Sequence, residues 1–80
     1  NISNKEYRIQ LGAFGKFSNA DRYLNGLVVK DSQIIKLFIE EDNLTGLFKI
    51  KSVRSFSKDE GKSICINFKN ININCILSLI

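Results

Sequence analysis

The segment Tyr7–Phe14 has alternating apolar and polar residues, the pattern of a strand with one buried face. Ile9 and Leu11 are apolar, whereas Arg8 and Gln10 between them are polar. Gly12 and Gly15 follow Leu11 closely, and the next predicted element begins at Ser18. We therefore predict a central strand that supplies core on one face and exposes Gln10 on the other.

Two later segments carry apolar residues every three or four positions, which predicts amphipathic helices. The first is predicted to begin at Ser18, which with Asp21 resembles a capping box, and the second follows a complete capping box of Ser57 and Glu60. The apolar stripe of the first helix is Ala20, Tyr23, Leu24, Leu27 and Val28. That of the second is Gly61, Ile64, Cys65 and Phe68.

Alternation returns in three more segments, Ile34–Glu40, Leu47–Val53 and Ile71–Ile80, which are predicted strands. Turn-forming residues at 42–46 join the first two as a hairpin. The residues expected to face the core are Ile35, Leu37 and Ile39, then Phe48 and Ile50, then Ile71, Ile73, Cys75, Leu77 and Leu79. The order is strand, helix, strand, strand, helix, strand.

The two halves of the chain also resemble each other. YRIQ at 7–10 is similar to FKIK at 48–51, and FSNAD at 17–21 is similar to FSKDE at 56–60. A β-α-β unit used twice predicts an α+β fold of the ferredoxin or RNP type. Its four-stranded antiparallel sheet carries both helices on one face, so the other sheet face is left open.

The length of 80 residues suits a single domain, with residues 1–6 as a linker end or frayed arm. Apolar residues make up 44% and charged residues 25%, which is ordinary for a globular domain. No apolar run is long enough to span a membrane. Because the chain starts at Asn1 and contains no methionine, we expect it to be a processed or excised piece of a larger protein.

The composition offers little for catalysis or for metal binding. There is no histidine, so the serines have no neighbouring base of the usual kind, and two cysteines cannot form a four-ligand zinc site. The carboxylates at 40–42 sit in a polar hairpin where solvation explains them. We expect no cofactor, metal or enzymatic activity. Cys65 and Cys75 are either a buried pair of thiols or a disulfide, since both are predicted to face the core.

The predicted open face mixes basic, amide and apolar side chains, and the net charge is +4. Its residues are Arg8, Gln10, Lys36, Phe38, Leu47, Lys49, Lys51, Asn72, Asn74 and Ile76. A merely solvated face is one interpretation. A polysaccharide site using amides, cations and flat apolar surfaces is another, and a nucleic-acid site is a third, although an RNP1-type run is missing. A protein-interaction surface on this face or on the edge strand at Ile34–Glu40 is a fourth.

The run YRIQLGAFGKFSNADRYLNGL at 7–27 resembles the opening of sporulation-related repeat (SPOR) domains. Members begin with an aromatic or aliphatic residue, followed by V-Q-x-G-[SA]-F, a loop and an N-A-[ED] helix start. The matching residues are Tyr7, Gln10, Gly12, Ala13, Phe14, Asn19 and Ala20. GLFKIK at 46–51 is similar to the third strand of the family, so the resemblance covers about residues 6–80.

This resemblance implies a β-α-β-β-α-β fold and a non-catalytic module that binds peptidoglycan glycan strands stripped of stem peptides. It implies concentration at the division septum as a monomeric part of an exported envelope or periplasmic protein, such as a cell-division protein or rare lipoprotein A. Any catalytic domain, such as a lytic transglycosylase, or membrane anchor would belong to that parent protein, and no nucleic acid is expected.

The predicted binding residues combine the open face, which supplies Arg8, Phe38, Lys51 and Ile76, with the positions that the resemblance implies, which are Gln10, Ala13, Leu47 and Lys49. Ala13 occupies a position where the family often has a serine that contacts the ligand. Leu47 and Lys49 occupy the positions of the aromatic residue and the arginine in the family's third strand. The Gly-Pro that closes that strand is missing, and Phe38 or Phe48 is a candidate for the absent stacking surface.

Overall fold

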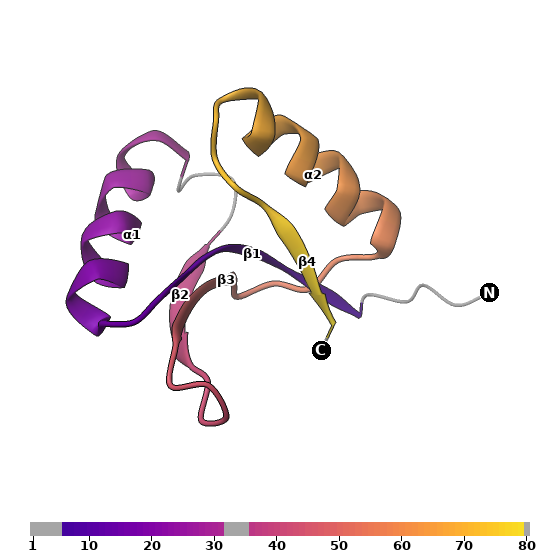
Figure 1. The fold of residues 1–80 in the computed structure, drawn as a ribbon. Coiled ribbons are helices and arrows are strands. Elements are labelled where there is room, and N and C mark those ends of the chain that lie inside the picture. The colour runs from indigo at the N-terminus through magenta and orange to yellow at the C-terminus, as the bar shows by residue number, and fades with distance from the viewer. Residues whose placement is uncertain (1–5, 32–35, 80) are drawn as a thin grey trace.

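The computed structural model describes residues 6–31 and 36–79, and the side chains of all these except 28–31. The elements are β1 (Tyr7–Phe14), α1 (Phe17–Asp31), β2 (Leu37–Glu41), β3 (Phe48–Ser52), α2 (Lys58–Asn70) and β4 (Ile76–Leu79). The predicted order of strands and helices and the predicted α+β fold class are confirmed (Figure 1). Ile34 and Ile35, predicted to open the second strand, lie outside the described residues.

The four strands form one antiparallel sheet in the order β2-β3-β1-β4, so β1 is central as predicted. Both helices lie on the same side of the sheet (Figure 1). The core between the layers is built from buried side chains of the sheet and of both helices. These include Ile9, Leu11 and Ile50 from the sheet, Ala20 and Leu27 from α1, and Cys65 and Phe68 from α2. None of the described helices is long and apolar enough to cross a membrane.

A β-bulge at Leu11 interrupts the pairing of β1 with β3. Gln10 pairs with Lys51, but Gly12 pairs with the adjacent residue Ile50, so β1 has one more residue than β3 at this point. Directly paired side chains lie on the same face of a sheet. Leu11 and Gly12 therefore both face the core, and the side chains beyond them switch faces relative to simple alternation.

The region after the bulge is packed around Gly12. A Cβ atom on this residue would lie 3.0 Å from Cε1 of the Phe14 ring, so the missing side chain leaves room for that ring. Phe14 in turn packs against Tyr23 of α1, with ring centroids 5.2 Å apart. Glycine inside a strand often marks such a bulge or close approach.

The two helices begin differently. α1 begins at Phe17, where the Lys16 carbonyl accepts hydrogen bonds from the N–H groups of Asn19 and Ala20, both at 3.2 Å. The predicted capping box at Ser18 is therefore wrong, because Ser18 already lies inside the helix. α2 has the predicted cap, in which Ser57 Oγ accepts from the N–H of the third helical residue, Glu60, and the Glu60 carboxylate accepts from the Ser57 N–H.

The last strand is shorter than predicted, since β4 begins at Ile76 rather than Ile71. Ile71 is the C-cap of α2, and Asn72 adopts a left-handed φ of 64° that reverses the chain. Ile71 is 52% exposed, so the prediction that it faces the core is wrong. Leu79 shares the sheet face of Leu77 through its pairing with Tyr7, as predicted, but it is 66% exposed at the end of the strand. Cys75 is buried and Leu77 packs against the core, as predicted.

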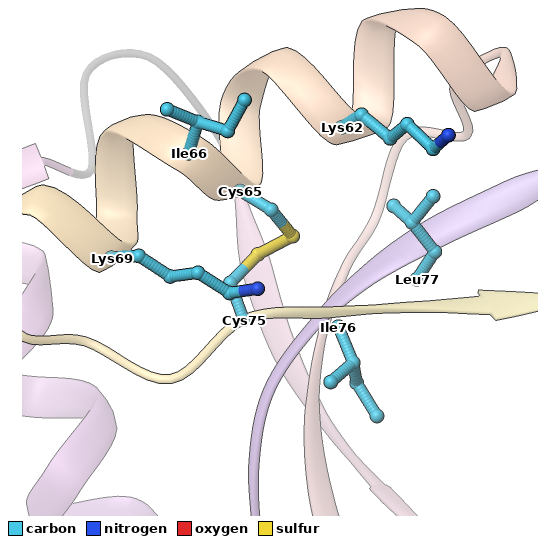
Figure 2. Close-up of a pocket in the computed structure, with 7 residues that line it drawn as sticks. All are labelled: Lys62, Cys65, Ile66, Lys69, Cys75, Ile76 and Leu77. Carbon is cyan, nitrogen blue, oxygen red and sulfur yellow. A yellow bond between two sulfur atoms is a disulfide. The ribbon is translucent and has the colours of Figure 1, made fainter.

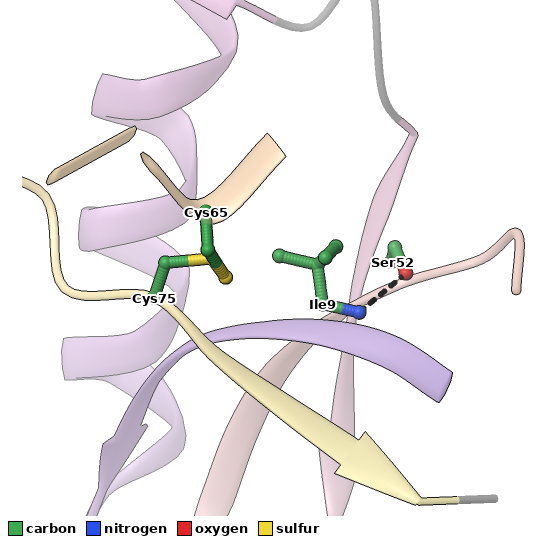
Figure 3. Close-up of a disulfide and its surroundings, with 4 residues drawn as sticks. All are labelled: Ile9, Ser52, Cys65 and Cys75. Atoms are coloured by element: carbon green, nitrogen blue, oxygen red, sulfur yellow. Dashed lines mark hydrogen bonds between the residues drawn. A yellow bond between two sulfur atoms is a disulfide. The ribbon is translucent and has the colours of Figure 1, made fainter. Parts of the chain in front are cut away.

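One buried hydroxyl completes the β1–β3 junction. Ser52 is fully buried, and its Oγ accepts a hydrogen bond from the Ile9 N–H at 3.0 Å (Figure 3). The same hydroxyl donates to the Arg54 carbonyl at 2.7 Å. Ser52 thus extends the connection between the two central strands beyond their last backbone pair, at Gln10 and Lys51.

Candidate functional site

The bulge brings Gln10 and Ala13 to the same open face of the sheet. Three positions apart on a regular strand, the two side chains would point to opposite faces. After the bulge, however, Ala13 pairs with Lys49, and Gln10 pairs with Lys51. Both lysines lie on the open face because Ile50 between them is buried in the core. The two β1 residues that we predicted to contact a ligand are therefore neighbours on one surface.

A row of paired residues crosses the open face through all four strands. Phe38 of β2 pairs with Lys51 of β3, Lys51 pairs with Gln10 of β1, and Gln10 pairs with Ile76 of β4. At the usual spacing of neighbouring strands the row is about 14 Å long. It offers apolar surface at both ends and an amide near its centre, a pattern that suits an extended ligand with hydroxyl groups and flat apolar faces.

The two lysines of β3 are already paired with carboxylates. Lys49 Nζ lies 2.8 Å from Asp42 Oδ2, and Lys51 Nζ lies 2.6 Å from Glu40 Oε1. The hydrogen bond from Lys49, helped by the Leu44 N–H, lowers the pKa of Asp42 from 3.8 to about 2. Around these lysines the face therefore presents ion pairs rather than free positive charge, which weakens the nucleic-acid interpretation, because phosphate binding relies on available cations.

Phe38 is not a bare aromatic platform. The Arg8 guanidinium lies over its ring, 5.6 Å from the centroid, and so covers part of one end of the row. Arg8 Nε is buried and has no hydrogen-bond partner among the described residues. The other aromatic candidate, Phe48, packs against the core and contacts Phe17 edge-to-face. Phe48 therefore cannot provide stacking surface on the open face.

Leu47 lies apart from the row. It precedes β3 at the base of the hairpin, where its carbonyl accepts from the Asp42 N–H at 2.8 Å. It lies four positions before Lys51, or about 13 Å along a strand. The structure thus groups Arg8, Gln10, Phe38, Lys51 and Ile76, with Ala13 and Lys49 beside them, and leaves Leu47 at the margin.

A cavity of about 410 Å³ opens beside the row, where β1 continues past the start of β4. Its lining residues are Gln10, Leu11, Gly12, Lys69, Asn74, Cys75 and Ile76. A second cavity of about 420 Å³ lies between α2 and β4 and shares Lys69, Cys75 and Ile76 with the first (Figure 2). Lys69 was not among the predicted binding residues, because it belongs to α2 in the helical layer and no local sequence pattern links it to the sheet.

The disulfide between Cys65 and Cys75 fixes this corner of the site. It joins α2 to the residue just before β4, with Cα atoms 5.1 Å apart (Figure 3). Cys75 is followed by Ile76, which pairs with Gln10. The crosslink therefore holds the end of the row and the walls of both cavities. Among the described residues no cluster of three or more potential metal ligands occurs.

Comparison with known proteins gives one structural likeness. The sequence matches no protein-family model and no curated protein. The fold, however, is similar to the solution structure of the peptidoglycan binding domain of the B. subtilis cell wall lytic enzyme CwlC. The TM-score is 0.72 at 26% sequence identity, over 100% of this chain and 96% of that domain. The likeness therefore extends over the whole of this chain and nearly all of the other.

Proposed function

We propose that this chain is a non-catalytic module that binds peptidoglycan, and that it recognises glycan strands lacking stem peptides, as SPOR domains do. In this proposal the glycan lies along the row of Phe38, Lys51, Gln10 and Ile76, and the Gln10 amide hydrogen-bonds sugar hydroxyls. Ile76 contacts a flat sugar face. Binding would carry the parent protein to the division septum.

The observation that carries this proposal is the full-length likeness to a peptidoglycan binding domain, combined with the open face beside Gln10. The bulge supports it, because it explains why a Q-x-G-A-F segment places its glutamine and its alanine on one surface. The disulfide supports a location in the oxidising cell envelope or periplasm, where such bonds persist.

Co-sedimentation with purified peptidoglycan tests the proposal. The domain should bind amidase-treated peptidoglycan, which lacks stem peptides, more tightly than untreated material. Gln10→Ala should weaken this binding roughly tenfold, because it removes one or two hydrogen bonds. Asn67→Ala, an exposed amide on α2, is the matched control and should bind as the parent domain does.

Two outcomes would contradict the proposal. One is failure of the folded domain to sediment with either form of peptidoglycan. The other is tight binding of RNA that falls steeply with added salt, which would favour the nucleic-acid alternative. Septal targeting is tested separately, by imaging a fluorescent fusion exported to the envelope of dividing cells, where the Gln10→Ala fusion should spread over the cell surface.

A further inference from the structure

Positive charge lies beside the candidate site on α2 as well as on the sheet, where the two β3 lysines are paired with carboxylates. Lys49 and Lys51 are held by carboxylates, and Arg8 lies over Phe38. By contrast, Lys62 and Lys69 are exposed and make no ion pair with any described residue. A negatively charged ligand that lies against α2 and β4 would therefore meet two lysines that are not already paired with a described carboxylate.

The two lysines border the cavities that continue from the row. Lys69 lines both, together with Cys75 and Ile76, and Lys62 lines the one between α2 and β4. In Figure 2 the two lysines extend from α2 on either side of Cys65 and the exposed Ile66, with Lys69 beside Cys75 and Lys62 toward Leu77. The cavities therefore form a path from Gln10, around Ile76, to a cleft with apolar walls and a cation at each end.

We infer that Lys62 and Lys69 bind the lactyl carboxylates of a glycan strand whose stem peptides have been removed. This inference rests on the proposed function. Stem peptides are joined to the lactyl groups through amide bonds, so their removal leaves one carboxylate on every second sugar. Lys62 and Lys69 are seven residues apart on α2, about 10 Å along the axis, which is of the order of one disaccharide.

The position of Lys69 has one purely structural explanation, since a cation in the last turn of a helix interacts favourably with the helix dipole. That explanation does not extend to Lys62, which lies in the second turn of α2. Nor does it account for the sharing of one cleft by both lysines. Carboxylate binding explains both positions, and gives the domain a way to distinguish a stripped strand from one that carries peptides.

Calorimetric titration with one tetrasaccharide in two forms tests the inference. The first form has free lactyl carboxylates, and the second has the same groups as methyl esters. The unmodified domain should bind the free acid more tightly than the ester, and added salt should reduce this difference. Lys62→Gln with Lys69→Gln should weaken binding of the acid by roughly two- to fivefold per lysine, and leave binding of the ester unchanged.

A control with the same loss of charge is Arg22→Gln with Lys58→Gln, both exposed and outside the two cavities. It should keep the preference for the acid. Equal affinity of the unmodified domain for acid and ester, or an unchanged preference in the Lys62 and Lys69 variant, would overturn the inference and leave the proposed function standing. Failure of the folded, unmodified domain to bind either form would instead overturn the proposed function.

Discussion

Replacing Ser52 by alanine should destabilise the domain strongly for a single hydroxyl. Ser52 and Ile9 are both fully buried, and the Ile9 N–H donates to Ser52 Oγ. Alanine would leave that N–H without its partner in the core, at a cost of about 1–3 kcal/mol. A domain of this size has a total free energy of unfolding of roughly 4–12 kcal/mol. The loss is thus a substantial part of the total, and corresponds to a fall in melting temperature of roughly 5–20 °C.

Urea unfolding followed by circular dichroism measures this change, and hydrogen exchange of the Ile9 amide shows where it arises. Ser63→Ala, an exposed serine on α2, is the control and should change stability by less than about 0.5 kcal/mol. The explanation is refuted if Ser52→Ala lies within that same range of about 0.5 kcal/mol. It is also refuted if the Ile9 amide stays as protected in the variant as in the parent relative to global unfolding.

Three other predictions concern stability. Reducing the disulfide, or changing Cys65 and Cys75 to serine, should lower the free energy of unfolding by about 3 kcal/mol in the chain-entropy model. Mass spectrometry with and without reductant checks that the bond is present, and an unchanged midpoint of urea unfolding would contradict the prediction. Pairing lowers the pKa of Asp42 to about 2, so the stability that its carboxylate contributes should be complete above about pH 4 and be lost as the pH falls toward 2. The melting temperature of Asp42→Asn should therefore lack this fall between about pH 4 and about pH 2. Gly46 has a φ of 74°, so Gly46→Ala should cost about 1–2 kcal/mol and Gly46→Asn less, as measured by urea unfolding.

Much of the fold could be predicted because periodicity and burial agree in most elements. Ile9 and Leu11 face the core as the alternation predicts, and Ala20 and Leu27 lie on the buried side of α1. The capping box of Ser57 with Glu60 identified the start of α2 correctly, because both of its hydrogen bonds are local. Local signals of this kind depend only on residues a few positions apart.

The errors came at helix ends, where the spacing of apolar residues does not report how the backbone starts or stops a helix. Ile71, Ile73 and Cys75 alternate like a strand, yet the first of them caps α2, and Asn72 turns the chain before pairing begins. At the start of α1, backbone bonds to the Lys16 carbonyl replaced the side-chain cap expected at Ser18. Neither outcome can be read from apolar spacing, because each depends on the backbone conformation and hydrogen bonds of a few residues at a helix end.

The candidate site depends instead on contacts between distant residues. The motif identified Gln10 and Ala13, but only the bulge explains how both share a face, and Gly12 was the sequence signal for it. The charges at the site could not be predicted from composition, because the partners of Lys49 and Lys51 lie across a hairpin.

Pairing those lysines changes what the open face can select. Because Lys49 and Lys51 are paired with carboxylates, the part of the face around them gains little from a generic polyanion, and affinity along the row comes mainly from hydrogen bonds and apolar contact. We assign discrimination by charge to α2, where Lys69 lines the same cavity as Gln10. If this division of roles is right, Gln10→Ala should weaken binding of every glycan form alike, whereas substitutions on α2 should change only the preference among them.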